Sequence, residues 1–378
     1  MDKLGLYIHI PFCARKCRYC DFVSYEVADH DVHMAYSLKN IMEVSEKSHV
    51  FGDKYLVDTI YIGGGTPSII EAGFVSEMLD AVYSHFRVEN DCEITIEVNP
   101  VSATLDKYKA YVNAGINRVS IGVQSFDPGT LSFLGRLHTE DEAERAIKEA
   151  GNSGFDNINI DLMFGVPRQS LTDWERDLKK TLKFSPKHVS FYSLGIEEGT
   201  PMCKDLQEGA FEEVDEITDR RMYHLAKEML ADAGFSHYEI SNAAIPGYES
   251  RHNLKYWSMD PYLGFGVAAH SYFNGRRFSN TSNLTKYLAA AGTADMIDWA
   301  HENTQGDEMS EFIFLGLRRT AGIRLSDFNS CFGRDFWELY GEETNKLIRR
   351  GLLEHAGDEL RLTDLGLDLA NNVFSEYV

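Results

Sequence analysis

The sequence contains no apolar run that approaches the roughly 18 residues needed to span a bilayer. Its first residues, MDKLGLYIHI, lack the basic region, apolar stretch and small-residue cleavage site of a secretory signal. Cysteine is also scarce, and Cys92, Cys203 and Cys331 stand singly, unlike the cysteines of a secreted disulfide framework. We therefore expect a cytoplasmic protein with no transmembrane segment, in which these three cysteines are ordinary core or surface residues.

Positive charge is in short supply as well. The chain carries 37 Lys and Arg residues against 59 Asp and Glu residues, a net charge of -22. Because neutralising phosphates requires clustered Lys and Arg, nucleic acid is not expected as the main partner. The acidic surface also offers no evident patch for anionic lipids. A length of 378 residues with 43% hydrophobic residues predicts a globular protein of two or three domains, or one barrel-sized domain with an appendage.

Up to about residue 200, short β-branched or aromatic runs alternate with charged stretches of helical period, the pattern of repeated β-α units. Capping-box pairs, Thr139 with Glu142 and Thr172 with Glu175, mark two helix starts. Six apolar strands joined by helices predict a parallel sheet covered on its outer face. The runs are LGLYIHI, DTIYIGG, CEITIEV, NRVSIGV, NINIDLMFG and HVSFYSL, with helices near 31–49, 72–86, 104–114, 140–153 and 172–184.

Polar residues stand at or near the carboxyl ends of three of these strands: Glu97, Gln124 and Asp161. Periodicity alone does not separate an open doubly wound sheet from a curved partial barrel. In barrel enzymes, however, active sites are assembled at the carboxyl rim of the strands. One such residue is more often a strand cap, whereas three in successive strands predict a site.

Beyond residue 200 the pattern changes. A long helix is expected over 213–234, and residues 284–300 also have a helical pattern. Near the C-terminus, a helix over 333–350 followed by the hairpin-like GLLEHAGDELRLT predicts a small winged-helix-like module, with NTQGDEM as the nearest approach to a linker. Residues 305–378 carry eight Lys and Arg against fourteen Asp and Glu, which favours a packing or lid role over DNA binding. We divide the chain into a barrel domain (1–235), a connecting segment (236–303) and a C-terminal module (304–378).

The segment LYIHIPFCARKCRYCDF holds Cys13, Cys17 and Cys20 within eight residues. Cysteine thiolates are soft ligands for zinc and iron–sulfur clusters, and close spacing lets several reach one centre. Structural zinc normally takes four protein ligands, and no CxxC or HxxxH partner stands nearby. His9 lies within the first predicted strand and is a poor fourth ligand. A four-iron cluster held by three thiolates keeps one iron open, as a substrate-binding metal site requires.

A second signal is the glycine-rich YIGGGTPS, residues 61–68, at the end of the second predicted strand. Glycine permits positive φ angles and a close approach of the backbone to a ligand. A phosphate-binding loop would need a following Lys, which is absent. By itself the glycine triplet is as consistent with a tight turn as with a ligand site.

The spacing C-x3-C-x2-C directly after a first strand resembles the radical S-adenosylmethionine (SAM) superfamily. In that superfamily the open iron of a [4Fe-4S] cluster chelates the amino and carboxyl groups of SAM. The ordered motifs LYIHIPFC, GGGTPS, EVNP, GVQSF and DLMFGVP narrow the resemblance to the group that contains oxygen-independent coproporphyrinogen III oxidase and related heme chaperones. The resemblance covers most of the chain, including the C-terminal module.

This resemblance implies a fold and a set of cofactor-binding residues. The fold is an α/β incomplete (β/α)6 barrel with a smaller α+β winged-helix-like module, and Cys13, Cys17 and Cys20 hold the cluster. Carboxylates suit ribose hydroxyls and an arginine suits the methionine carboxylate, although Arg136 could equally pair with the acidic run after it. The residues implied to contact SAM are Tyr7, Tyr19, Gly64, Gly65, Thr66, Glu97, Gln124, Arg136 and Asp161.

Two features place the chain within that group. The oxidase pattern carries a further cysteine two residues past the third cluster thiol, where this sequence has Phe22. The segment HNLKYW, residues 252–257, resembles the H-N-x-x-Y-W segment associated with heme binding in the chaperones. Imidazole is a natural axial ligand of heme iron, and aromatic rings suit the faces of a macrocycle. The resemblance thus implies His252 as a heme ligand, although a lone histidine beside aromatic residues is otherwise more often structural.

The favoured interpretation is a heme chaperone that binds heme and passes it to an acceptor protein, which could belong to the respiratory chain. It would use a [4Fe-4S] cluster with an open iron that binds SAM. The alternatives are a coproporphyrinogen III dehydrogenase, which decarboxylates two propionates oxidatively, and a radical SAM enzyme acting on heme. Whether the chain is an enzyme stays open at this point, and no catalytic residue is assigned.

Overall fold

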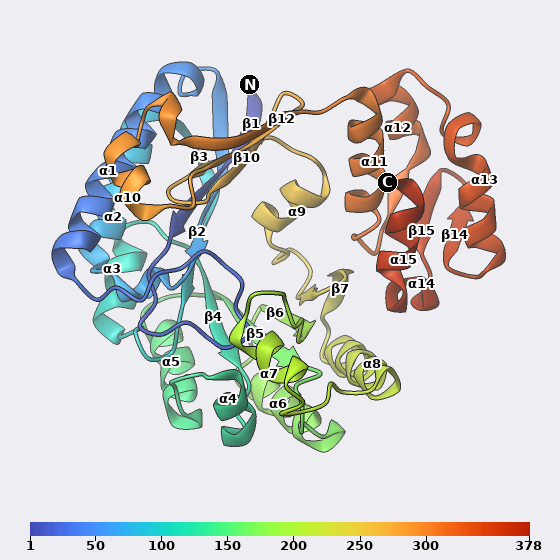
Figure 1. The fold of residues 1–378 in the computed structure, drawn as a ribbon, viewed down its shortest axis with the longest axis horizontal. Helices are drawn as coiled ribbons and strands as arrows, with labels where there is room; N and C mark the ends of the chain where they lie inside the picture. Colours follow the sequence, from blue (N-terminus) through green and yellow to red (C-terminus); the bar gives the residue numbers. More distant parts are fainter.

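The computed structural model of the chain describes all 378 residues and contains one large and one small sheet (Figure 1). The twelve strands of the large sheet follow the order β12-β11-β10-β9-β1-β2-β3-β4-β5-β6-β8-β7. Because its first and last strands do not pair with each other, the sheet is curved but open. This architecture confirms the predicted α/β incomplete barrel. No helix is both long and apolar enough to cross a membrane.

Six neighbouring parallel strands form the centre of the large sheet, as the six apolar runs predict. Their carboxyl ends meet at one rim, where Ile10 is paired with Gly64 and Gln124 with Leu162. The loop that holds the three clustered cysteines leaves the first strand at this rim. The strands are β1 (Asp2–Ile10), β2 (Tyr55–Gly64), β3 (Arg87–Val98), β4 (Arg118–Gln124), β5 (Asn157–Phe164) and β6 (His188–Ser193).

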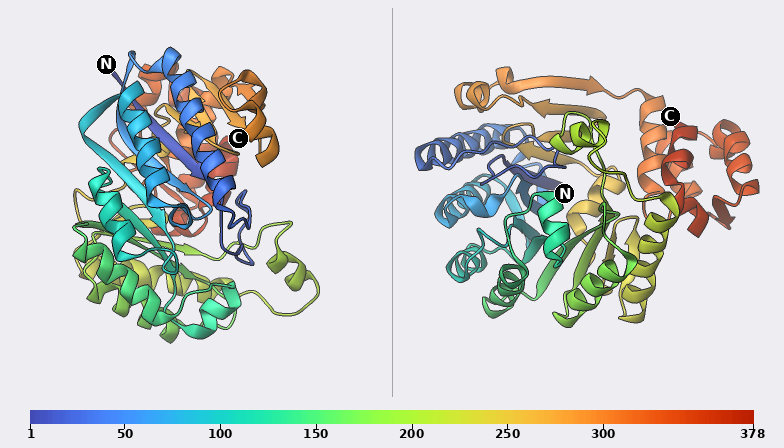
Figure 2. Two further views of the ribbon diagram at one scale, coloured as in Figure 1. Left: turned by 90° about the vertical axis from the view of Figure 1, so that its left-hand side faces the viewer. Right: turned by 60° about the horizontal axis from the view of Figure 1, so that its bottom comes forward.

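Helices between these strands cover the outer face of the sheet (Figure 2). Fully buried aliphatic side chains such as Leu6, Ile60 and Leu178 fill the space between the two layers, and their removal from water stabilises the barrel. The longer helices are α1 (His30–Phe51), α2 (Ala72–His85), α3 (Leu105–Asn113), α5 (Glu140–Asn152), α6 (Leu171–Lys183) and α8 (Glu216–Asp232).

Side-chain caps fix where two of these helices begin. Thr139 and Glu142 form the predicted capping box of α5. The predicted pair of Thr172 with Glu175 is wrong, because the capping box lies two residues earlier and is formed by Ser170 and Asp173. Ser170 has the extended backbone of an N-cap, whereas Thr172 already lies inside the helix.

Two short helices at the rim contact the cysteine loop through one arginine. The backbone N–H of Arg18 donates to Leu134 O, at the end of α4 (Pro128–Leu134). The Arg18 carbonyl accepts a hydrogen bond from Met202 N, at the start of α7 (Pro201–Gln207). The loop is therefore fastened from two sides by backbone hydrogen bonds.

Residues 236–303 extend the large sheet at both edges. At one edge β8 pairs antiparallel with β6, and at the other β9 pairs parallel with β1. Helix α9 (Arg251–Trp257), which contains HNLKYW, lies on the concave side between the sheet and the C-terminal module (Figure 1). The strands are β7 (Ser236–Glu239), β8 (Asn242–Ala244), β9 (Tyr262–Phe265), β10 (His270–Phe273), β11 (Arg276–Asn280) and β12 (Ile297–Glu302).

The helix predicted over 284–300 is wrong in its second half. Helix α10 (Leu284–Ala290) ends before Gly292, which has a φ of +83°, and the chain then enters β12. Antiparallel pairing with β11 decides the conformation of this stretch, and local periodicity does not record that pairing. The segment NTQGDEM, predicted as a linker, is instead the start of helix α11 (Gln305–Gly316), where Thr304 forms a capping box with Asp307.

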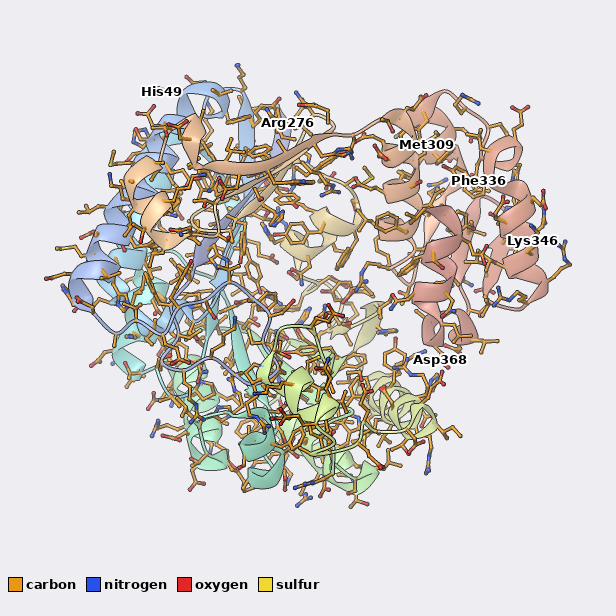
Figure 3. All side chains as sticks on the ribbon, in the orientation of Figure 1. His49, Arg276, Met309, Phe336, Lys346 and Asp368 are labelled. Carbon is orange, nitrogen blue, oxygen red and sulfur yellow. The ribbon has the colours of Figure 1, made fainter.

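The C-terminal module combines helices with a three-stranded sheet in which β14 and β15 form the predicted hairpin. Phe336 points into the module, and Asp368 lies on the side that faces α8 (Figure 3). There Asp368 contacts His224 at 3.0 Å and Arg220 at 3.5 Å. The remaining elements are β13 (Ile323–Arg324), α12 (Leu325–Phe332), α13 (Phe336–Arg349), β14 (Leu353–Ala356), β15 (Glu359–Leu362), α14 (Asp364–Asp368) and α15 (Ala370–Phe374).

Candidate functional site

The three clustered cysteines line one cavity of about 520 Å³ on the concave side of the barrel. Cys13, Cys17 and Cys20 are all free thiols. Burial raises the pKa of Cys13 and Cys20, as is usual for thiols without a metal. Three thiolates on one loop are soft donors, a set that fits an iron–sulfur cluster.

The glycine-rich turn after β2 packs directly against the cysteine loop. Gly64 has a φ of +114°, and a Cβ there would lie 2.5 Å from the imidazole of His9. A Cβ on Gly65 would lie 2.8 Å from the Phe12 carbonyl oxygen and 3.1 Å from Cys13 Sγ. Thr66 Oγ1 donates to Cys13 Sγ at 3.6 Å. Only glycine therefore allows this turn to approach the cysteines so closely.

Glu97 near the end of β3 is held inside the same cavity by two donors. Its carboxylate accepts hydrogen bonds from Tyr61 Oη at 2.7 Å and from Gly64 N at 3.1 Å. Burial raises the pKa of Glu97 to about 7, so the group changes charge near neutral pH. One carboxylate oxygen contacts the glycine turn, which places the acid beside the cysteine rim.

Gln124 and Asp161 line the cavity from the next two strands. Gln124 has a φ of +66° beside a register shift between β4 and β5, an uncommon conformation for a residue other than glycine. Its Oε1 accepts a hydrogen bond from Tyr192 Oη at 2.7 Å. The Asp161 carboxylate accepts from Ser120 Oγ at 3.0 Å and from the Asn159 amide at 2.6 Å. Burial raises the pKa of Asp161 as well.

Arg136 follows the short helix α4 and turns into the cavity, away from the acidic run that follows it in the sequence. Its Nη1 donates to Cys17 Sγ at 3.5 Å, and its Nη2 donates to the Gly122 carbonyl. The guanidinium does not pair with the acidic run, because a thiol and a carbonyl hold it at the cysteine rim. A cation in this place can stabilise thiolates or bind a carboxylate.

The two tyrosines implied to flank SAM occupy different positions. Tyr19 lines the cavity between the cysteines. Tyr7 does not line it, since its hydroxyl lies 2.9 Å from His9 Nδ1 and its ring packs 6.3 Å from that of Tyr61. Tyr61, the register partner of Tyr7 on β2, lines the cavity in its place.

His252 on α9 is fully buried and does not line the cavity, although its neighbour Asn253 does. Its Nδ1 lies 2.8 Å from Thr59 Oγ1 and its Nε2 lies 2.9 Å from Tyr256 Oη. Burial lowers the pKa of His252 to about 3, so the imidazole is neutral. Both ring nitrogens are therefore engaged by the protein itself.

The second half of HNLKYW lines a second cavity. Tyr256 and Trp257 line a cavity of about 260 Å³ between α9, the β9–β10 edge and α11. Its other walls are largely aromatic and aliphatic, and the guanidinium of Arg318 lies 4.3 Å from the centre of the Trp257 ring. Of the motif's side chains, Asn253 thus lines the large cavity, Tyr256 and Trp257 line the smaller one, and His252 lies in the protein core.

Several cavity residues were not predicted from the sequence. They alternate along the strands, so that each second side chain faces inward. This period of two in otherwise apolar strands is the signal that could have found them. The residues are Tyr61, Arg118, Ser120, Asn159, Ser190 and Tyr192.

Comparison with known proteins identifies the two parts of the chain. Residues 7–181 match the radical SAM superfamily, and residues 303–369 match the HemN C-terminal domain. The fold is similar to the solved structure of coproporphyrinogen III oxidase (HemN), a radical SAM enzyme from Escherichia coli. The TM-score is 0.86 at 22% sequence identity, covering 100% of this chain and 90% of that one. These findings confirm the predicted resemblance at the level of the fold.

The sequence is also similar to curated proteins over its whole length. It is 39% identical over 381 residues to the heme chaperone HemW of Escherichia coli (strain K12), covering 100% of this chain and 99% of that protein. It is 34% identical over 372 residues to the heme chaperone HemW of Lactococcus lactis subsp. lactis (strain IL1403), covering 98% and 96%. Identity at this level across both chains shows that the protein belongs to the HemW family within the radical SAM superfamily.

Proposed function

We propose that the protein binds heme and passes it to an acceptor protein, while holding a [4Fe-4S] cluster with an open iron that binds SAM. The observation that carries this proposal is the identity, over the whole length of the chain, to proteins named heme chaperones. Phe22 supports it, because this residue stands where the oxidase pattern has a further cysteine. Its side chain lines the cavity mouth and is 62% exposed.

Cys13, Cys17 and Cys20 would hold the cluster, since they are free and line the same wall of the cavity. When bound, the cluster supplies an iron with a free coordination position. Thr66 and Arg136 donate to Cys13 and Cys17, and such hydrogen bonds to sulfur stabilise thiolates. The dispersed, unpaired state of the other three cysteines supports a reducing, cytoplasmic location.

The chain's own groups fit the parts of SAM. Glu97 and Asp161 offer carboxylate oxygens for ribose hydroxyls, and Arg136 offers a guanidinium for a carboxylate near Cys17. The Gly64–Thr66 turn offers backbone close to the cysteines, and Tyr19 and Gln124 complete the walls. Tyr7 would act indirectly, by packing against Tyr61.

For heme we keep His252 as the proposed axial ligand, with Tyr256 and Trp257 beside the macrocycle. Iron can reach the imidazole only after a hydrogen bond to Thr59 or Tyr256 is released. We also keep 1–235, 236–303 and 304–378 as the functional division, with the C-terminal module closing over α9. The acceptor could be a respiratory protein.

The test compares heme with coproporphyrinogen III on the same anaerobically reconstituted protein, with SAM and a reductant present. We expect about one heme per chain and no decarboxylated porphyrinogen product above a control in which the three cluster cysteines are replaced by alanine. Product formation well above that control would make the chain an oxidase and overturn the proposal. Failure to bind heme at all would also overturn it.

A further inference from the structure

Arg118, the first residue of β4, is a buried cation without a partner. Its side chain is 1% exposed, lines the large cavity, and has no hydrogen-bond partner at Nε. No carboxylate oxygen lies within 4.0 Å of its guanidinium nitrogens. The other buried cation of the chain, Lys255, is compensated, since it pairs with Asp58 at 2.8 Å. Burying an isolated charge is costly, so an uncompensated one calls for an explanation.

The acids that share the cavity are already engaged by other donors. Glu97 accepts from Tyr61 and from the glycine turn, and Asp161 accepts from Ser120 and Asn159. The nearby imidazole of His188 is neutral, because burial holds its pKa well below the ordinary value, and a neutral imidazole does not compensate a cation. The guanidinium therefore has donors to spare. Burial raises the pKa values of Glu97 and Asp161 and the charge of Arg118 partly offsets this rise from a distance, but no carboxylate of the protein is hydrogen-bonded to the guanidinium.

Arg118 lies at the amino-terminal end of β4, in a part of the cavity that we call the deep end, away from the cysteine end of the same strand. Arg118 is level with Thr95 on β3 and, through it, with Tyr61 on β2. Gln124, at the cysteine rim, is six residues further along the same strand, a span of about 20 Å. Arg136 serves the rim end, where it contacts Cys17. The two arginines thus face two separate parts of one cavity.

The deep end also adjoins HNLKYW. Tyr61, level with Arg118, stacks on His252 with ring centres 5.3 Å apart, and Asn253 lines the cavity. Asn242 lines the cavity too, but its Nδ2 already donates to Glu239 and its free Oδ1 is an acceptor, so it does not contribute a donor. The amide of Asn253 and the guanidinium of Arg118 are donors that suit a carboxylate.

We propose that Arg118 binds a carboxylate of a ligand that occupies the deep end of the cavity beside SAM. The inference rests on the proposed function, in which this group is a propionate of heme. Charge-assisted hydrogen bonds in such a low-dielectric place are strong, and they compensate the cation only when the ligand is present. Arg118 is thus a specificity residue for a tetrapyrrole acid.

The test measures the affinity of Arg118→Gln for heme, for heme dimethyl ester and for SAM. Arg145→Gln is the control, because Arg145 is 52% exposed on α5 and does not line the large cavity. We expect Arg118→Gln to weaken heme binding about ten- to a hundredfold and to leave the ester and SAM within about twofold. Arg118→Lys should recover part of the heme affinity. Equal weakening of heme and ester, or weakening of SAM alone, would overturn the inference.

Stability of the ligand-free protein gives a second readout. Removing an uncompensated buried charge should leave Arg118→Gln at least as resistant to urea as the unchanged protein. A variant clearly less stable than Arg145→Gln would show that Arg118 is a structural cation and would overturn the inference. If the unchanged protein binds no heme, the proposed function fails, and coproporphyrin III becomes the probe. Binding of coproporphyrin III that depends on Arg118 then supports the inference, and its absence overturns it.

Discussion

The Nε2 atom of His252 lies 2.9 Å from the hydroxyl oxygen of Tyr256, one turn further along helix α9. Residues four apart face the same side of a helix, so the motif's own tyrosine occupies the nitrogen that a heme iron would need. Thr59 on β2 occupies the other nitrogen. In this geometry, ligation of heme iron by His252 competes with two hydrogen bonds inside the protein, one to Tyr256 and one to Thr59.

Replacing Tyr256 with phenylalanine should therefore tighten heme binding. The ring and its packing are kept, while the hydrogen bond to Nε2 is lost and no longer has to be broken. Because a buried hydrogen bond contributes about 1 kcal/mol, we expect roughly a fivefold gain in heme affinity and a loss of stability of similar size. Heme titration followed in the visible spectrum measures the first effect, and urea unfolding the second.

His252→Ala is the complementary variant, because it removes the proposed heme ligand, and we expect it to weaken heme binding. If both variants bind heme as the unchanged protein does, the imidazole is a core residue that holds α9 to β2. In that case the heme ligand must be sought elsewhere.

Replacing any one of the three loop cysteines, Cys13, Cys17 or Cys20, with alanine should abolish the binding of iron and sulfide after reconstitution. Each thiol is one of only three protein ligands to the proposed cluster, so no spare ligand can replace it. Cys203→Ala and Cys331→Ala are the controls, because these free cysteines do not line the large cavity. Iron and acid-labile sulfide per chain are the measurement, and full iron content in any of the three loop variants would contradict the assignment.

The raised pKa of Glu97 predicts how stability changes with pH in the cluster-free protein. Burial raises this pKa from 4.5 to about 7, so between these values the folded state keeps a proton that the unfolded state has lost. The free energy of unfolding must therefore fall as the pH rises through that window. At roughly 1.4 kcal/mol per pKa unit, the contribution of Glu97 falls by about 3 kcal/mol.

The measurement is the difference in unfolding free energy between the unchanged protein and Glu97→Gln across this range. Buried histidines such as His9 and His237, whose pKa values are lowered to about 4, contribute the opposite slope but cancel in the difference. Asp177→Asn is the matched control, with a window from 3.8 to about 6. A flat difference curve for Glu97→Gln would show that the carboxyl group is already ionised below pH 5.

Local signals in the sequence were enough for the six central parallel strands, the helices between them and the cysteine loop, but not for the six strands added at the sheet edges. Apolar runs fix the strands, and the cluster spacing depends on no distant residue. Features that depend on how the strands pair were missed. Arg118 and Ser120 alternate with apolar residues in RVSIGVQ, but only the pairing of β4 with β3 and β5 shows which face of the strand lines the cavity. The same holds for Tyr7 and Tyr61, register partners of which only Tyr61 reaches the cavity. One hydrogen-bond partner of the His252 ring, Tyr256, lies on the same helix, but the other, Thr59, comes from β2 and is 193 residues away in the sequence.

The contact between the glycine turn and the cysteine loop predicts that Gly65→Ala damages the cluster site. A Cβ at residue 65 would lie 2.8 Å from the Phe12 carbonyl oxygen, so the backbone before Cys13 must move. We expect iron content to fall by more than half, with a loss of stability of about 1–3 kcal/mol from overpacking. Gly73→Ala is the control, because no atom lies within 4 Å of its Cβ and alanine favours helix α2. Full iron content in Gly65→Ala would mean that the loop adapts freely, and the glycine would then serve only the turn.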